Sequence, residues 1–291
     1  MPDKMLSKPM AIACASGGFK AIFVHGVLSA FEEANIKADA YAAASASVFA
    51  IDWAVIGKAK EVGISYWLEG LKVYHQTKSM SRVSLAGISY FMANDNQIWS
   101  SNKSKFYIAA SAVINPEAAE QTQGKGATRL GKRLLISATK GDRSWANQNL
   151  RLDLFSNDRN DNLALNWVNF AEVAYASTRM LHAYDLPAWI DRQPYIDASY
   201  TCICPAIEMV ERGYQSVIAI ATEPGNLYRD LFQLEVIPTQ YQQVPIQIIQ
   251  PDINLKELGV DFFQATPEGI AAVYQHGLEK GRKFLTNTIS P

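Results

Sequence analysis

A serine stands at a corner of small residues between two apolar segments. Residues 41–47 read Tyr-Ala-Ala-Ala-Ser-Ala-Ser; they continue a strand predicted from position 37 and lead into the apolar segment 48–56. A serine held at a tight turn from a strand into a helix presents its hydroxyl as a nucleophile. Ala43 and Ser47, two residues before and after Ser45, are small enough to let strand and helix pass the corner. The alternative is that Ser45 is one small residue in a tightly packed turn.

A glycine-containing loop earlier in the chain supplies groups that such a serine needs. Gly17 and Gly18 interrupt the segment Ser-Gly-Gly-Phe-Lys-Ala at 16–21. Glycines between a strand and a helix expose backbone N–H groups, and the helix N-terminus adds positive potential, which suits an oxyanion or a phosphate. The loop fits neither the dinucleotide-binding nor the Walker pattern. Lys20 is expected either to contact a substrate head group or to cap the loop.

Asp197 is the best candidate for the base. It follows a short strand in a turn of small residues, Asp-Ala-Ser at 197–199. A partly desolvated carboxylate near a serine can take its proton directly, because burial raises the pKa of the carboxyl. An ordinary turn aspartate is the alternative.

The histidines fit a catalytic triad less well. An α/β-hydrolase would use Ser45, either Asp252 or Asp261, and His276, which is the right chain order for that fold. However, Ser45 follows only two predicted strands, too early for that fold, and a helix interior is a poor place for its histidine. We expect all histidines to be surface or packing residues: His25, His75, His182 and His276.

Strand and helix patterns alternate along the chain and predict a parallel sheet with right-handed crossovers. Strands are predicted at 10–15, 37–44, 133–139, 150–155, 194–196, 216–221 and 245–250. Helices are predicted at 21–34, 48–56, 166–177, 205–213 and 269–285, the last with Thr266 as N-cap. Residues 63–125 are rich in aromatic side chains and are expected to be helical, and 121–131 form a polar loop. The pattern predicts a single α/β domain over 1–291.

The composition narrows the class of function. Hydrophobic residues make up 48% of the 291 residues, enough for a sizeable core. The formal net charge of -1 argues against a nucleic-acid binder. The three cysteines, Cys14, Cys202 and Cys204, form neither a disulfide framework nor a structural zinc pattern. With no apparent signal peptide or membrane span, a cytoplasmic protein is expected, with peripheral lipid contact left open.

Three segments in one order resemble the patatin-like phospholipases, a family of lipid acyl hydrolases. That family carries Gly-Gly-Gly-x-Arg/Lys-Gly, then Gly-x-Ser-x-Gly, then Asp-Gly-Gly or Asp-Gly-Ala. Here the three motifs read Ser-Gly-Gly-Phe-Lys-Ala at 16–21, Ala-Ala-Ser-Ala-Ser at 43–47 and Asp-Ala-Ser at 197–199. Segments at 134–139, 174–180 and 251–252, with the final helix, extend the likeness to about 10–286.

The resemblance implies a three-layer α/β/α fold with a mostly parallel central sheet and a Ser–Asp dyad without histidine. Ser45 would be the nucleophile and Asp197 the base, and the N–H groups of Gly17, Gly18 and Phe19 would bind the oxyanion. It implies no metal or other cofactor, and as substrate an acyl lipid of the phospholipase A, lysophospholipase or galactolipase type, met at a membrane surface. For such a hydrolase, the aromatic-rich segment 64–99 would form an acyl groove or a membrane-facing lid; the alternative is that its aromatic side chains only pack in the core.

The chain departs from the family motifs at their glycines. Ala or Ser stands at positions 16, 21, 43, 47, 198 and 199. A positive φ at such a position would make Ala or Ser costly by about 1 kcal/mol. Two alternatives to hydrolysis therefore stay open: an acyltransferase on the same site, and a non-catalytic lipid-binding protein on a decayed hydrolase scaffold.

Overall fold

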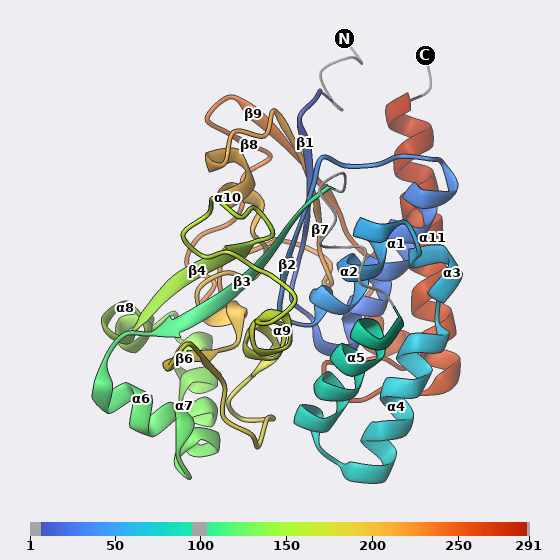
Figure 1. Cartoon of the computed structure of the whole chain (residues 1–291). Coiled ribbons are helices and arrows are strands. Elements are labelled where there is room, and N and C mark those ends of the chain that lie inside the picture. Colours follow the sequence, from blue (N-terminus) through green and yellow to red (C-terminus); the bar gives the residue numbers. More distant parts are fainter. Residues whose placement is uncertain (1–6, 95–103, 290–291) are drawn as a thin grey trace.

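A twisted, mostly parallel sheet forms the centre of the molecule (Figure 1). The computed structural model describes residues 7–94 and 104–289, and within them nine strands join in the order β5-β6-β3-β2-β1-β7-β9-β8, with β4 paired to β3. The strands are β1 (Met10–Cys14), β2 (Ala40–Ala44), β3 (Lys105–Val113), β4 (Leu150–Ser156), β5 (Trp189–Ile190), β6 (Gln193–Ile196), β7 (Ser216–Ile220), β8 (Gln240–Tyr241) and β9 (Val244–Ile249).

The five central strands run parallel. Each of the neighbouring pairs β3–β2, β2–β1, β1–β7 and β7–β9 is parallel, whereas β4, β6, β5 and β8 pair antiparallel. Every residue of β1, β2 and β7 is buried, as expected of strands covered on both faces. The expected α/β class with a mostly parallel sheet is confirmed.

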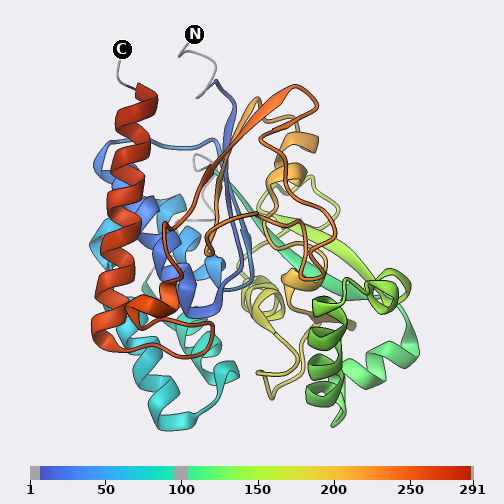
Figure 2. The ribbon, with the colours of Figure 1, turned by 180° about the vertical axis from the view of Figure 1, so that it is seen from behind.

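Helices cover both faces of the sheet (Figures 1 and 2). One side carries α1 (Ala21–Glu33), α2 (Val48–Ile56), α3 (Ala59–Val62), α4 (Ser65–Thr77), α5 (Met80–Asn94) and α11 (Pro267–Ile289). The other side and the far end of β3 carry α6 (Pro116–Gln123), α7 (Ala127–Thr139), α8 (Ser144–Asn149) and α10 (Ala206–Glu211), and α9 (Phe170–Thr178) packs beside β3. The result is a three-layer α/β/α arrangement.

The first and last helices pack against each other through glycines. A Cβ atom at Gly26 of α1 would lie 2.2 Å from the carbonyl oxygen of Tyr274, and one at Gly277 of α11 would lie 2.2 Å from that of Phe23. Neither position could hold a side chain without moving backbone. This close contact fixes α1, whose N-terminus follows the Ser16–Gly18 loop.

One predicted strand is wrong. Residues 133–139 lie in helix α7, although Leu134, Leu135 and Ile136 form a continuous apolar run. The apolar run suggested a strand, but burial follows helical spacing, and Ile136 within the run is 57% exposed. The buried residues of the helix are Ala127, Leu130, Gly131 and Leu134. The segment 134–139 is therefore not the family strand that the resemblance suggested. The predicted loop at 121–131 is also wrong, because α6 continues to Gln123 and α7 begins at Ala127.

The strand β3 was not predicted. Its sequence lies inside the aromatic-rich region 63–125, and it shows no polar alternation because residues 106–113 are all buried. The other predicted strands are present within a few residues, although β2 begins at Ala40 rather than at position 37. Thr266 does cap α11, since its hydroxyl accepts the Gly269 N–H at 3.0 Å.

Candidate active site

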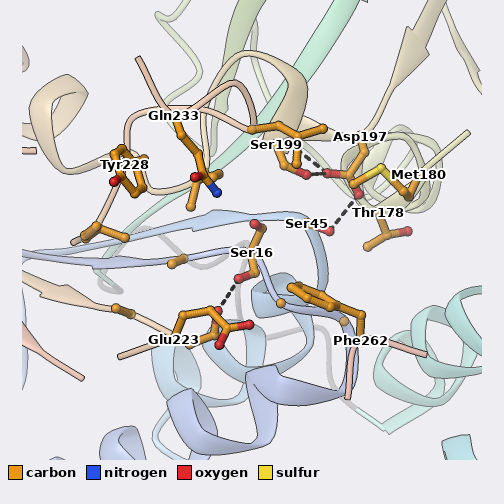
Figure 3. A pocket seen from close by; sticks show the side chains of 18 of the residues that line it. Ser16, Ser45, Thr178, Met180, Asp197, Ser199, Glu223, Tyr228, Gln233 and Phe262 are labelled. Carbon is orange, nitrogen blue, oxygen red and sulfur yellow. Dashed lines mark hydrogen bonds between the residues drawn. The ribbon is translucent and has the colours of Figure 1, made fainter. Parts of the chain in front are cut away.

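Ser45 and Asp197 are joined by a direct hydrogen bond (Figure 3). The Ser45 Oγ donates to Asp197 Oδ2 across 2.7 Å, although 152 residues separate them in sequence. Both are buried, with 6% and 1% of their surface exposed. The distance lies within the range in which a carboxylate can take the proton of a nucleophile.

The register of the sheet explains why these two residues meet. In the parallel pair β2–β3, Ala44 lies opposite Ala109, so the next residue, Ser45, comes level with Ala110. In the antiparallel pair β6–β3, Ile196 lies opposite Ser111, so Asp197 arrives at the same level from the other direction. Strands β2 and β6 end on the same edge of β3, so the residues that follow them, Ser45 and Asp197, lie next to each other.

Ser45 stands at a sharp turn in a left-handed backbone conformation. Its φ is 55°, a left-handed value that is costly for a serine. It begins a short 3₁₀ helix, η3 (Ser45–Ser47), that leads from β2 into α2, and its N–H donates to Ser177 Oγ of α9 at 2.9 Å. Strain held by surrounding contacts is common at functional sites.

Asp197 is oriented by groups on three sides. Its Oδ1 accepts hydrogen bonds from the N–H of Ser199, at 2.8 Å, and from the Ser199 hydroxyl. Its backbone carbonyl accepts from Ser111 Oγ of β3 at 2.8 Å, and its backbone N–H donates to the Arg179 carbonyl oxygen at 2.9 Å. These bonds leave Oδ2 to Ser45.

Burial raises the pKa of the Asp197 carboxyl to about 6. Desolvation is the dominant cause, and the hydrogen bonds from Ser199 and Ser45 oppose it because they stabilise the charged form. A carboxylate with a pKa near neutrality is a better proton acceptor than one at its usual value near 4.

The Ser16–Gly18 loop lies beside this pair and leaves two N–H groups unused. Among the described residues, the N–H groups of Gly17 and Gly18 have no hydrogen-bond acceptor. Gly18 has φ +55°, and a Cβ there would lie 2.1 Å from the carbonyl oxygen of Phe262, so no other residue fits. The Phe19 N–H differs, because it donates to that carbonyl at 2.9 Å. The loop therefore offers two free donors, not the three that the resemblance implied.

Lys20 is held away from the site. Its Nζ lies 2.5 Å from Glu223 Oε1 and 3.5 Å from Asp261 Oδ1, and its side chain is only 4% exposed. It also lies 4.4 Å from the centre of the Phe262 ring. Lys20 does not line the cavity that holds Ser45. The structure thus ties the loop down through Lys20, in line with a capping role rather than a head-group contact.

The replaced motif glycines carry no left-handed strain. The residues with positive φ do not include Ser16, Ala21, Ala43, Ser47, Ala198 or Ser199. Ser47, for example, has φ -66°, which any residue adopts. Its hydroxyl donates to the carbonyl oxygen of Ala15, directly before the glycine loop. The small residues at these positions therefore fit the corner as it is built.

Two cavities meet at the site. The first has a volume of about 530 Å³ and holds Ser45, Asp197 and the glycine loop (Figure 3). The second, of about 300 Å³, lies between α4 and α5, and Gly18 and Tyr184 line both. Its wall is mostly aromatic and aliphatic and includes Phe49, Tyr66, Trp67, Met80, Val83 and Tyr90.

The histidines take packing or surface positions, as expected. His25 is fully buried in α1: Nε2 lies 2.8 Å from the Ala59 carbonyl oxygen, and Nδ1 accepts the Trp67 indole N–H at 2.9 Å. Burial lowers its pKa to about 4, which keeps it neutral. His276 Nε2 accepts the Asp252 N–H at 3.3 Å. No histidine is among the described residues that line the Ser45 cavity.

Several residues around the dyad were missed from the sequence. The contact with Ser199 could have been predicted, because an aspartate side chain in a turn commonly accepts the backbone N–H of the second residue after it. Ser111 and Ser177 carry no such local signal, since they reach the site from β3 and α9.

In the part of the chain that the structure describes, no group of three or more His, Cys, Asp or Glu could hold a metal ion, and no helix is long and apolar enough to cross a membrane.

Comparisons with known proteins find no sequence relative and a distant structural likeness. No protein-family model matches the chain, and no curated protein matches its sequence. The crystal structure of VipD from Legionella pneumophila is similar over 96% of this chain, with 10% sequence identity and a TM-score of 0.46. The chain spans 66% of the length of that structure. The function of the present chain must therefore be inferred from its own residues.

Proposed function

We propose that the chain is a serine ester hydrolase of the patatin-like type that acts on acyl lipids. The observation that supports this most directly is the 2.7 Å hydrogen bond from Ser45 Oγ to Asp197 Oδ2. The unused N–H groups of Gly17 and Gly18 lie on the same cavity and add the donors that an oxyanion requires. Nucleophile, base and oxyanion donors are the three parts of an acyl-transfer site.

The reaction proceeds in two halves. Asp197 takes the proton of Ser45 as Oγ attacks the ester carbonyl, and Gly17 and Gly18 hydrogen-bond the oxyanion that forms. The carbon–oxygen bond to the alcohol then breaks, and Asp197 returns the proton to the leaving oxygen. In the second half, Asp197 takes a proton from water, whose oxygen attacks the acyl-Ser45 carbonyl. The tetrahedral intermediate that forms then collapses: the bond from the acyl carbon to Ser45 Oγ breaks, Asp197 returns the proton to Oγ, and the fatty acid leaves.

The second cavity supports an acyl chain as the other part of the substrate. It begins beside Ser45, at Ala46 and Gly18, and extends between α4 and α5 over apolar side chains. A buried methylene contributes about 0.8 kcal/mol, so an alkyl chain would bind there favourably. This agrees with the acyl groove expected over 64–99, of which residues 95–99 lie outside the described part of the chain. Phe262, which lines the first cavity and is 41% exposed, would contact the lipid surface in a peripheral mode.

Labelling with a fluorophosphonate tests the nucleophile. We expect the probe to modify Ser45 in the wild type, and we expect ester turnover to be lost in Ser45→Ala and in Asp197→Asn. The matched controls are Ser144→Ala and Asp191→Asn, both exposed, with Asp191 in the turn of the hairpin that carries Asp197. Absence of labelling at Ser45 under every lipid condition would reject the proposal and leave the non-catalytic alternative.

The same acyl-enzyme could pass its acyl group to an alcohol instead of water. Product analysis in the presence of candidate acceptors separates the two reactions. We expect free fatty acid as the main product. An acyl ester of the acceptor as main product would assign the site to an acyltransferase.

A further inference from the structure

The wall of the Ser45 cavity is mostly apolar but carries several polar side chains, and none of the described residues that line it is positively charged. Beyond the dyad, its polar side chains include Thr222, Asn226, Tyr228 and Gln233. Among the described residues that line it, only Asp197 and Glu223 are charged, and neither lysine, arginine nor histidine is present. Gln233 and Tyr228 lie on the side away from Met180, and Glu223 lies across from them near Ser16 (Figure 3).

The cation of the glycine loop, Lys20, is already neutralised. Lys20 contacts two carboxylates, Glu223 and Asp261, and is buried beneath the Phe262 ring. Its ammonium therefore has no charge to offer a ligand. Glu223, in contrast, uses only Oε1 in this ion pair, and 40% of its side chain is exposed. Its second carboxylate oxygen, Oε2, makes no hydrogen bond within the described residues and can accept one.

We infer that this side of the cavity binds the alcohol half of the ester, and that it selects an uncharged polyhydroxyl alcohol, such as glycerol or a sugar, over one that bears a phosphate. The inference rests on the proposed ester hydrolysis. Hydroxyl groups both donate and accept, so they match carboxylate, amide and hydroxyl partners. A phosphate would add negative charge beside Glu223 and Asp197, with no cation among the described lining residues to pair with, and an unpaired charge removed from water is costly.

Two lipids that differ only in the phosphate test this selection. We would compare 1-acylglycerol with 1-acylglycerol 3-phosphate of the same acyl chain, both below their aggregation concentrations, and measure kcat/KM for each. We expect 1-acylglycerol to be favoured at least about tenfold, because like charges placed side by side at a binding site are strongly unfavourable. Equal turnover, or faster turnover of the phosphate, would overturn the inference.

Glu223→Gln tests the cause of the selection. It removes one of the two cavity carboxylates, and Lys20 keeps Asp261 as its partner, so we expect the ratio between the two lipids to fall several-fold towards one. Glu257→Gln is the matched control, because Glu257 is exposed and does not line the cavity, and it should leave the ratio unchanged. A Glu223→Gln ratio equal to that of the wild type would contradict the assignment.

Failure of this inference and failure of the proposed hydrolase can be told apart. Binding of both lipids to Ser45→Ala reports the selection without turnover, and tighter binding of 1-acylglycerol is expected. Hydrolysis of a 4-nitrophenyl acyl ester reports the reaction without a polyol. Turnover of that ester that depends on Ser45, combined with equal binding of the two lipids, would reject only the selection.

Discussion

The Ser47 hydroxyl donates a hydrogen bond to the carbonyl oxygen of Ala15. Ser47 lies two residues after Ser45, and Ala15 lies immediately before the glycine loop. Both are buried, with exposures of 0% and 1%. The bond therefore ties the turn that carries Ser45 to the loop that carries the unused N–H groups. In the family motif that this chain resembles, a glycine at this position could not make it.

Restoring that glycine should harm the protein. In Ser47→Gly the Ala15 carbonyl loses a buried partner and a flexible residue enters the turn, so we expect a loss of about 1–2 kcal/mol in the free energy of unfolding and a lower kcat. Urea denaturation and ester hydrolysis measure the two effects. Ser47→Ala separates loss of the hydroxyl from gain of flexibility. A Ser47→Gly variant that is both more stable and more active would mean that the serine is a defect.

The left-handed backbone at Ser45 predicts an unusual order of stabilities. In most positions alanine is more favourable than glycine, but at φ 55° glycine avoids the clash of Cβ with the backbone. We expect Ser45→Gly to exceed Ser45→Ala by about 1 kcal/mol in the free energy of unfolding, with neither variant active. Thermal or urea unfolding of the two inactive proteins gives the comparison. The reverse order would indicate that the turn does not hold this conformation in solution.

The sequence singled out residues that the structure brings together, but it did not predict the point at which they meet. Ser45, Asp197 and the glycines could be identified because each lies at the end of an apolar run with a recognisable turn. The strand beside which both residues lie, β3 at the level of Ala110, could not be identified. A strand that is buried on both faces shows no polar alternation, so its sequence resembles that of a buried helix. The dyad is thus a consequence of strand register, which no local pattern encodes.

Some predictions were wrong or incomplete because they depend on tertiary contacts that a local sequence pattern does not show. Residues 134–136 resemble a strand because a run of three apolar residues fits either structure. Gly131 shows the tertiary reason for the helix, since a Cβ there would lie 2.5 Å from the His182 backbone nitrogen. Likewise, Lys20 resembled a ligand contact because Glu223, its partner in the ion pair, lies 203 residues away.

The raised pKa of Asp197 predicts an acid limb in the pH profile. Asp197 must be ionised to take the Ser45 proton, and its pKa in the folded protein is about 6. For a soluble 4-nitrophenyl ester we therefore expect kcat/KM to fall tenfold for each pH unit well below 6 and to level off above about 7. A limb near pH 4 would show that the carboxylate is solvated in the free enzyme.

The same shift predicts a stability gain for Asp197→Asn. The pKa is raised from 3.8 to about 6 on folding, so the folded protein binds the proton more tightly, and the stabilisation present below pH 3.8 is lost as pH rises through 6. Asparagine has no charge to desolvate. The variant should thus exceed the wild type in the free energy of unfolding by up to about 3 kcal/mol above pH 7, and by much less near pH 4. Urea titrations across this range test it, with the exposed-site variant Asp191→Asn measured alongside for comparison. A pH-independent difference would mean that the charge of Asp197 is not the cause.

A methyl group at Gly18 should disable the loop while the rest of the fold persists. Gly18→Ala would place Cβ 2.1 Å from the Phe262 carbonyl oxygen in addition to the cost of its left-handed φ. Gly213→Ala is the matched control, because Gly213 also has a left-handed φ, +89°, yet nothing lies within 4 Å of its Cβ position. We expect Gly213→Ala to lower the free energy of unfolding by about 1 kcal/mol and to leave the activity unchanged. Gly18→Ala should lose more stability and at least about a hundredfold in kcat, since a shift of about 1 Å in the loop displaces the oxyanion donors. Equal activity in the two variants would remove Gly18 from the oxyanion site.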